Sequence, residues 1–171
     1  ALMPGDNIYR TFPNLYTIRG TPHRDVKSWV KSLDHMRSLK PDYLLPSHTK
    51  PLEGQEVLET LTIYRDAIQF VHDQTIRLMN KGHSPDEISH MIQLPPEVSS
   101  SPFVREFYGT VRWSVKSIFN GYLGWFDGNV SNLDPLPSED YAKRLAALSG
   151  GEKKLFEALE KAILDEDMQW G

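Results

Sequence analysis

The stretch VLETLTIYRDAIQFVHDQTIRL, residues 57–78, decides the fold because its apolar side chains recur every three or four residues. This spacing places one continuous apolar stripe on an α-helix of about seven turns. Gly82 follows shortly afterwards and provides a typical helix end. A helix of this length predicts a mostly helical protein packed around it. The stripe consists of Val57, Leu61, Tyr64, Ile68, Val71, Thr75 and Leu78.

The residues before this helix predict a short strand–helix–strand unit. Residues 15–19, LYTIR, are rich in β-forming side chains and are typical of a strand. Thr21 then offers an N-cap oxygen, and Pro22 suits the first position of a helix that extends to about residue 39. Residues 43–45 form a second short apolar run, which predicts another strand. In α/β folds the residues that follow each strand commonly carry the chemistry.

The residues after the long helix predict further helices joined by short loops. Ser84 opens a capping box, and Pro102 begins a helix expected to extend to about Tyr122. The glycine-rich stretch GYLGWFDGN then interrupts the helical pattern. Ser138 is expected to cap one more helix, and a last helix is expected to begin at Glu152. Several helix pairs with short connections favour a stacked, TPR-like array.

A change of composition near Gly54 predicts two domains. Residues 1–54 carry the strand–helix–strand pattern, and residues 55–171 read as helical throughout. The expected fold class is therefore mostly α, with a short α/β piece followed by a helical domain.

Composition excludes several classes of protein. A net charge of -4 provides no broad basic surface, so we expect no nucleic-acid partner. No apolar run approaches the ~20 residues that a membrane span requires. Without cysteine the chain has neither disulfides nor thiolate metal sites, and a metal would need His, Asp or Glu ligands. The opening residues ALMPGDNIYR read as the middle of a longer protein, so we also expect the chain to be a fragment.

Among the six histidines, His48 stands apart because it follows a predicted strand. It lies in YLLPSHTKPLEG, residues 43–54, where two prolines stiffen its surroundings. Two interpretations stay open from the residues alone: a structural turn residue, or a metal ligand. His72 lies on the long helix and suggests a hydrogen-bonded packing role. Surface positions are expected for His23, His35, His83 and His90.

Three other features have both structural and functional interpretations. Asp6 lies in the turn-like PGDN, where its carboxylate would accept local backbone hydrogen bonds or bind a metal. Arg19 closes the first predicted strand and could clamp a sulfate, phosphate or carboxylate, or pair with a surface acid. Tyr122, Trp125 and Phe126 form an aromatic cluster suited to core or interface packing.

Four stretches together resemble the alkyl sulfatases of the metallo-β-lactamase superfamily. They are NLYTIRGTPHRDVKSW (14–29), LLPSHTKPLEG (44–54), YRDAIQFVHDQTIRLMNKG (64–82) and YGTVRWSVKSIFNGYLGWFDGN (108–129). The resemblance implies a catalytic αββα domain with two zinc ions, then a helical dimerisation domain and usually a sterol-carrier-like domain. The chain would then hold the last part of the catalytic domain and an incomplete dimerisation domain, and its partners would be a second copy and an alkyl sulfate ester.

The resemblance also implies roles for individual residues. His48 corresponds to a late metal-binding histidine, and Asp6 stands where the family commonly has a metal-binding glutamate. Arg19 corresponds to an arginine that faces the sulfate of the substrate, and Asn14 is a weaker candidate for the same pocket. Trp113 and Ser114 lie in GTVRWSVK, residues 109–116, where better-known bacterial members tend to have a histidine near the substrate.

One departure limits what this chain is expected to do. The zinc signature His-x-His-x-Asp-His of the family is absent. Because two metal positions need about seven protein ligands, we expect the isolated chain to bind zinc weakly and to hydrolyse no alkyl sulfate. An alternative hypothesis is a helical dimerisation or scaffold module without catalytic duty. Another metallo-β-lactamase-like hydrolase is disfavoured by the long helical half.

Overall fold

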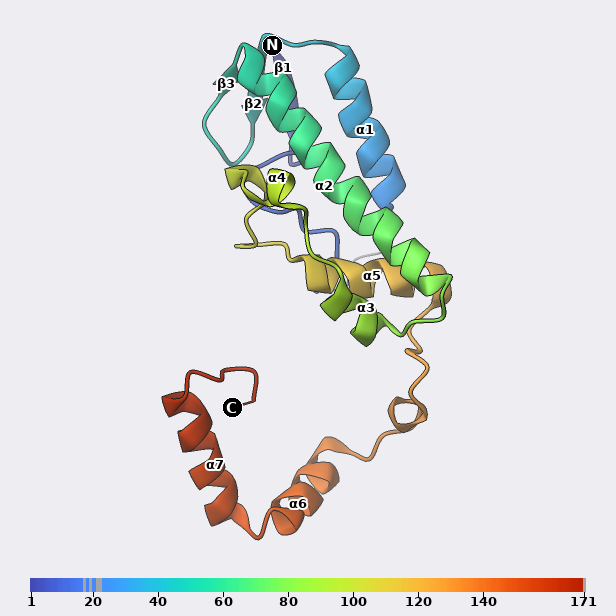
Figure 1. Cartoon of the computed structure of the whole chain (residues 1–171), viewed down its shortest axis with the longest axis vertical. Helices are drawn as coiled ribbons and strands as arrows, with labels where there is room; N and C mark the ends of the chain where they lie inside the picture. The colour runs from blue at the N-terminus through green and yellow to red at the C-terminus, as the bar shows by residue number, and fades with distance from the viewer. Residues whose placement is uncertain (17, 19, 21–22, 171) are drawn as a thin grey trace. The chain divides into compact units, whose positions relative to one another are not determined.

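The computed structural model describes residues 1–16, 18, 20 and 23–170 and divides the chain into two compact units (Figure 1). The first unit comprises residues 1–128 and the second residues 129–171. The predicted mostly helical fold is confirmed. The two compact units divide after Gly128. The domain boundary near Gly54 stays a prediction.

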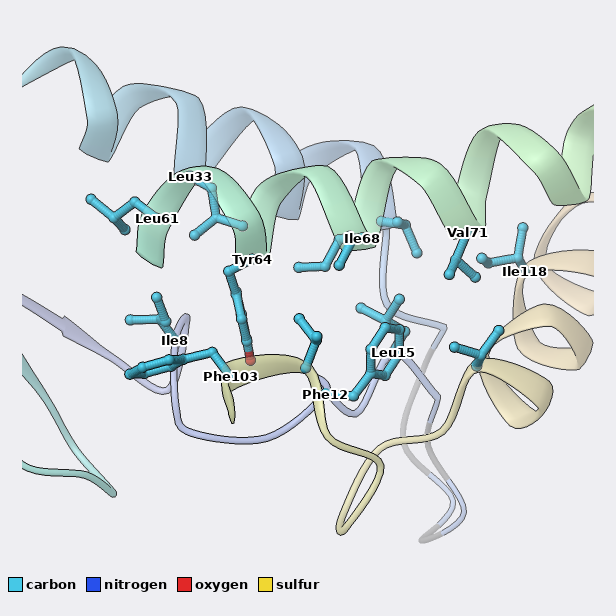
Figure 2. Packing of buried hydrophobic residues seen from close by; sticks show 14 of the residues in the cluster. Ile8, Phe12, Leu15, Leu33, Leu61, Tyr64, Ile68, Val71, Phe103 and Ile118 are labelled. Carbon is cyan, nitrogen blue, oxygen red and sulfur yellow. The ribbon is translucent and has the colours of Figure 1, made fainter. Parts of the chain in front are cut away.

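Helix α2 (Gln55–Met79) is the central element of the first unit, as its apolar spacing predicts. Helix α1 (Val26–Ser38) packs along it (Figure 1). The apolar stripe of α2 faces buried side chains from the N-terminal segment and from the later helices (Figure 2). Fully or nearly fully buried members of this core include Ile8, Phe12, Leu15, Leu33, Leu61, Tyr64, Ile68, Val71, Phe103 and Ile118.

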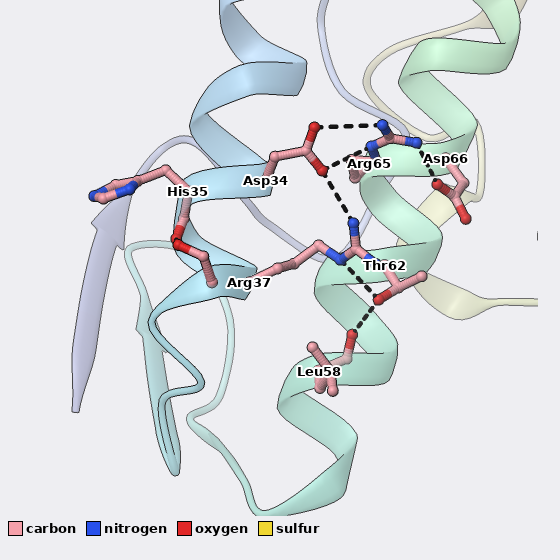
Figure 3. Close-up of polar contacts among 8 residues, drawn as sticks. Asp34, His35, Arg37, Leu58, Thr62, Arg65 and Asp66 are labelled. Carbon is pink, nitrogen blue, oxygen red and sulfur yellow. Dashed lines mark hydrogen bonds and ion pairs between the residues drawn. The ribbon is translucent and has the colours of Figure 1, made fainter.

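A network of charged side chains ties α1 to α2 on the solvent side of the core (Figure 3). Arg65 donates from Nε to Asp34 at 3.0 Å, and Arg37 donates to the same carboxylate at 3.0 Å. Arg65 also pairs with Asp66 at 2.9 Å. Burial opposes ionisation of Asp34, but the two guanidinium groups outweigh it and hold the pKa of this carboxyl below its ordinary value.

The small sheet contains β1 (Leu2–Gly5), β2 (Tyr43–Pro46) and β3 (Leu52–Glu53), in that order. β1 pairs with β2 in parallel, and β2 pairs with β3 antiparallel. The strand expected at 43–45 is confirmed.

The strand predicted over residues 15–19 is wrong for the part of it that the structure describes. Leu15 and Tyr16 are buried in irregular backbone, and Ile18 lies in a turn. The backbone N–H of Tyr16 donates to the side-chain oxygen of Asn14 at 3.3 Å, so a local turn replaces strand pairing there.

The start of α1 also differs from the prediction. Asp25 is the N-cap, and its carboxylate accepts hydrogen bonds from the backbone of Lys27 and the hydroxyl of Ser28. Asp is among the strongest N-cap residues, which explains why the helix begins at Val26. Thr21 and Pro22, the predicted cap and first residue, lie outside the described residues.

The single helix predicted from Pro102 is divided in the structure. After α3 (Pro85–Met91) and α4 (Pro96–Ser99), a short 3-10 helix η1 covers Pro102–Val104, and α5 (Val111–Leu123) begins separately. The capping box predicted at Ser84 is confirmed at the start of α3. Gly109 lies between η1 and α5 against the backbone of Pro13, where a Cβ atom would come within 2.1 Å of its carbonyl oxygen. Only a glycine, which has no Cβ atom, fits this close approach, and it lies in the segment that separates η1 from α5.

The second unit holds η2 (Val130–Asn132), α6 (Ser138–Leu148) and α7 (Glu152–Leu164), and α6 contacts α7. The predicted start of α7 at Glu152 is confirmed. The predicted cap of α6 is wrong by one residue, because Ser138 is the first helical residue and Pro137 stands at the N-cap without a side-chain hydrogen bond. Within this unit the two helices bury little of their apolar surface. Large exposed apolar side chains on them and after them are Tyr141, Leu145, Leu148, Leu155, Phe156, Ile163, Leu164, Met168 and Trp170. Across the described residues, no helix is long and apolar enough to cross a membrane.

Candidate active site

The parallel pairing of β1 and β2 brings Asp6 and His48 together. Asp6 directly follows β1, His48 follows β2, and Gly5 is in register with Pro46. Both side chains therefore leave the same edge of the sheet. The Nε2 atom of His48 lies 3.2 Å from Oδ1 of Asp6, with 67% and 72% of the two side chains exposed. The structure thus places these two predicted residues side by side, in reach of solvent.

Asp6 and His48 line a pocket of about 390 Å³. Its wall is mixed: one guanidinium group, one threonine hydroxyl and two tyrosine side chains accompany the carboxylate and the imidazole. The other lining residues are Tyr9, Thr11, Arg24 and Tyr108. An anionic group that enters this pocket would meet a guanidinium as well as the Asp6–His48 pair.

Arg24 is held in this wall by two contacts. One guanidinium nitrogen donates to the backbone oxygen of Asn14 at 2.7 Å, and the guanidinium carbon lies 6.0 Å from the centre of the Trp29 ring. None of the carboxylates in the described residues forms an ion pair with Arg24. Its charge is therefore fixed in place, with donors left for an anionic ligand.

Asn14 does not line the pocket, but it is hydrogen-bonded to two residues that do, Tyr9 and Arg24. It is 6% exposed, and its backbone N–H donates to the hydroxyl of Tyr9 at 2.8 Å. Burial raises the pKa of Tyr9, although the bond from Asn14 works in the opposite direction. Tyr9 therefore stays neutral, and Asn14 is positioned by Tyr9 on one side and Arg24 on the other.

The chemistry of Asp6 and His48 fits two ligands of a zinc ion. An imidazole nitrogen and a carboxylate oxygen are ordinary zinc donors, and here they adjoin each other at the rim of a pocket. A closed zinc site needs more ligands. Among the described residues no group of three or more His, Cys, Asp or Glu side chains could hold a metal ion. The two residues therefore fit part of a site.

The remaining candidates are distributed differently. Arg19, the predicted sulfate clamp, lies outside the described residues. Trp113 is on α5 and lines, with Tyr16, a second pocket of about 550 Å³. Ser114 is fully buried and donates to the backbone of Thr110 at 2.7 Å, so it faces the core. None of these three can be placed in the pocket of Asp6 and His48 from the described residues.

His72 is a residue of α2 at its packing contact with α5, and each of its ring nitrogens has a hydrogen-bond partner. Asp73 lies 2.8 Å from its Nδ1, and the hydroxyl of Tyr122 lies 2.9 Å from its Nε2. The expected hydrogen-bonded packing role of His72 is thus observed. Tyr122 joins this contact. Trp125 and Phe126 pack against each other, and Trp125 is largely exposed while Phe126 is about one-third exposed.

Sequence reasoning missed Arg24, Tyr9 and Tyr108 as pocket residues. With Thr21 as the expected N-cap, Arg24 falls in the first turn of the predicted helix, so the sequence does not single it out as a binding residue. Asp25 as a better N-cap was the signal that Arg24 precedes the helix. Tyr9 and Tyr108 approach only through the tertiary fold, and their ring centres lie 6.0 Å apart.

Comparison with known proteins gives consistent relatives. Residues 84–171 match the family described as alkyl sulfatase dimerisation. Over 94% of its length the chain is 48% identical to a linear primary-alkylsulfatase of Pseudomonas sp. (strain ATCC 19151), of which it covers 31%. Over 99% it is 35% identical to the alkyl/aryl-sulfatase BDS1 of Saccharomyces cerevisiae, of which it covers 27%.

A solved structure shares the fold. The stereoselective inverting sec-alkylsulfatase Pisa1 from Pseudomonas sp. is 31% identical and superposes with a TM-score of 0.91. The superposition covers 98% of this chain and 27% of that one. The chain therefore spans about a third or less of the length of these relatives.

Proposed function

The chain belongs to the alkyl sulfatase dimerisation family, and from this premise we propose that it acts as part of a zinc-dependent alkyl sulfatase. In this proposal the whole protein cleaves alkyl sulfate esters to an alcohol and sulfate. The curated relatives that match the chain almost end to end are alkylsulfatases by name. The observation that carries the proposal is the Asp6–His48 pair at the rim of a pocket that also holds Arg24.

Asp6 and His48 would hold zinc together with ligands from outside these 171 residues. Bound zinc supplies a Lewis acid that lowers the pKa of a water molecule towards neutrality. Aspartate has one methylene fewer than glutamate, so the carboxylate of Asp6 stays close to its strand. Its 3.2 Å contact with His48 supports a shared role of the two side chains at one ion.

Arg24 would bind the anionic sulfate group at the same pocket. Its guanidinium is fixed by the backbone of Asn14 and by Trp29, so little side-chain freedom is lost when an anion binds. A charge-assisted hydrogen bond from a fixed guanidinium would orient the sulfate and stabilise its negative charge as the ester bond breaks. The same role remains proposed for Arg19.

The 171-residue chain by itself would be inactive. Its described residues offer two adjoining zinc ligands, and hydrolysis through a zinc pair needs about seven. Weak zinc binding without turnover is therefore the expected behaviour of this chain.

A second copy of the chain would be its partner. The family takes its name from dimerisation, and its match includes all of α6 and α7. The exposed apolar side chains of these helices support an interface, because contiguous apolar surface on a protein commonly marks a contact site. The same observation favours the second candidate function, a dimerisation or scaffold module without catalytic duty.

Three measurements together separate the two candidates. They are molar mass by light scattering, sulfate release from dodecyl sulfate after zinc addition, and zinc binding by the unchanged chain and by His48→Ala. A dimer without sulfate release agrees with both candidates, and zinc binding that depends on His48 then favours the sulfatase segment. A monomer would contradict the proposed dimerisation, and rapid sulfate release would contradict the proposed inactivity.

A further inference from the structure

Trp29, near the start of α1, contacts two parts of the candidate site that are far apart in the sequence. Its indole Nε1 donates to the backbone oxygen of Asn7 at 2.9 Å, and its ring centre lies 6.0 Å from the guanidinium carbon of Arg24. Together with Asp6 and Arg24 it lines a recess of about 470 Å³. One side chain therefore contacts both the segment that carries Asp6 and the proposed sulfate-binding cation.

The contact with Asn7 anchors the turn that carries Asp6. The backbone N–H and the side-chain amide of Asn7 both donate to the backbone oxygen of Pro4, at 3.3 Å and 3.2 Å. These bonds close a turn over residues 4–7, in which Asp6 is the third residue. Because the carbonyl of Asn7 ends this turn, the bond from Trp29 fixes the turn, and with it the backbone of Asp6, against α1.

The contact with Arg24 follows from the way α1 begins. Asp25 is the N-cap, so Arg24 directly precedes the cap and Trp29 is the fourth residue of the helix. Side chains at these two positions commonly pack against each other and set the angle at which the chain enters a helix. Here a guanidinium replaces the usual apolar partner, and an indole is the aromatic ring that attracts a cation most strongly. The backbone N–H of Trp29 donates to the oxygen of Asp25 at 3.2 Å, so a closed helical turn carries the ring.

We propose that Trp29 is a positioning residue that fixes Asp6 and Arg24 relative to each other, through its indole N–H on one side and its ring on the other. This inference rests on the proposed function for the roles of Asp6 in zinc binding and of Arg24 in sulfate binding. Without the link through Trp29, each group would have to be ordered when its ligand binds, which lowers affinity.

The two contacts of Trp29 can be removed one at a time. Trp29→Phe keeps an aromatic ring and removes the indole N–H, whereas Trp29→Leu removes both. Trp125→Phe is the matched control, since it makes the same change at an exposed tryptophan whose ring packs edge-on against Phe126. Far-ultraviolet circular dichroism checks that each variant is folded. If Trp29→Leu does not fold, Trp29→Phe still tests the link to Asp6.

Nuclear magnetic resonance of the unchanged chain and of each variant, without ligands, measures the order of the two groups. Nitrogen relaxation of the Asp6 and Asn7 amides reports on the turn, and that of the side-chain Nε–H of Arg24 reports on the guanidinium. Zinc affinity is then measured by chelator competition. The affinity for inorganic sulfate is measured from the shift of the Arg24 signal at constant ionic strength.

Trp29→Phe should make the Asp6 and Asn7 amides more mobile and weaken zinc binding by about fivefold, while sulfate affinity changes by less than about twofold. Trp29→Leu should also make Arg24 more mobile and weaken sulfate binding by about threefold or more. Trp125→Phe should change none of these quantities. A residue that only filled space at the edge of the core would not separate the two affinities in this way.

The inference is overturned if Asp6 and Arg24 are as well ordered in both Trp29 variants as in the unchanged chain. It is also overturned if Trp29→Phe weakens zinc and sulfate binding equally, because the N–H and the ring would then have no separate roles. Zinc binding through His48 that neither Trp29 variant affects would support the proposed function and overturn this inference. The expected loss of order, in a chain that binds no zinc, would contradict the proposed function and leave the positioning role of Trp29 standing.

Discussion

His48 Nε2 lies 3.2 Å from Asp6 Oδ1, although the two residues follow different strands. Parallel pairing of these strands makes the contact a product of the fold. Because both side chains are mostly exposed, their mutual attraction in water contributes little to stability. The contact therefore matters for ligand binding at the pocket rather than for the stability of the fold.

The negative charge of the side chain at position 6 should control metal affinity. Asp6→Asn removes the negative charge and should weaken zinc binding by about tenfold or more, whereas Asp6→Glu should retain it. Zinc affinity is measured by competition with a chelating dye. Asp42→Asn, which changes an exposed carboxylate before β2, is the control and should leave the affinity unchanged. An equal loss of zinc affinity in Asp6→Asn and Asp42→Asn would show that Asp6 is not a zinc ligand.

The Asp34 network should contribute to stability in a pH-dependent way. The pKa of Asp34 is lower in the folded chain than in the unfolded chain, so its contribution is present above the unfolded pKa. The contribution is lost as the pH falls through the folded value. Asp34→Asn should therefore cost less than about 1 kcal/mol at pH 7 and nothing at strongly acidic pH, because the group is partly exposed and screened.

Urea unfolding of the unchanged chain and of Asp34→Asn at several pH values measures this difference. Asp42→Asn provides the comparison, since no ion pair is formed by that residue among the described contacts. A difference between the unchanged chain and Asp34→Asn that grows as the pH falls would contradict the assignment.

Two glycines should respond differently to the same change. Gly109→Ala would place a methyl group 2.1 Å from the Pro13 carbonyl oxygen, which is backbone, and should cost about 2 kcal/mol or more. In Gly121→Ala the nearest atoms to the new methyl group belong to the side chain of His23, which can move, so the cost in stability should be smaller. Thermal unfolding of both variants checks the order, and equal costs would show that the Pro13 contact is not restrictive.

The contact between His72 and Tyr122 should add to the stability of the α2–α5 packing. Tyr122→Phe leaves a ring nitrogen of a buried histidine without its partner and should lower the free energy of unfolding by about 1 kcal/mol. Tyr43→Phe removes a hydroxyl from an exposed tyrosine and should be neutral. Denaturant unfolding compares the two variants. An equal change in the free energy of unfolding would show that the hydrogen bond between His72 and Tyr122 does not stabilise the fold.

The second unit should carry the dimer contact. Leu148 and Leu164 are 86% and 83% exposed, and Leu164→Asp or Leu148→Asp should shift the chain from dimer to monomer. Leu58→Asp, on an exposed position of α2, should leave the mass unchanged. Light scattering at matched concentrations measures this, and a dimer that persists in both second-unit variants would place the interface elsewhere.

The strongly periodic and well-capped elements were predictable from the sequence. The stripe of α2, the capping box of α3 and the start of α7 follow from local rules and are observed. The start of α6 differs from the prediction by one residue, because Ser138 is its first residue and not its cap. Segments governed by long-range contacts were not predictable. Residues 15 and 16 have β-forming side chains, yet burial under α2 and the turn at Asn14 keep them out of the sheet.

The site was predictable in part for the same reason. Asp6 and His48 were identified as separate candidates, but their contact depends on the pairing of β1 with β2, and β1 itself was not predicted. Arg24 depends on where α1 begins. Tyr108 reaches the pocket only because Gly109 packs on Pro13. Such neighbours arise from the fold and leave no local pattern.

The measurement that tests the central claim most directly is zinc affinity, by chelator competition, for the unchanged chain and for His48→Ala. His35→Ala changes an exposed histidine on α1 and serves as the control. We expect zinc to bind the unchanged chain more weakly than about 1 µM, to be lost in His48→Ala and to be retained in His35→Ala. One tightly held zinc ion per chain, or binding that survives His48→Ala, would contradict the account of a partial site built on Asp6 and His48.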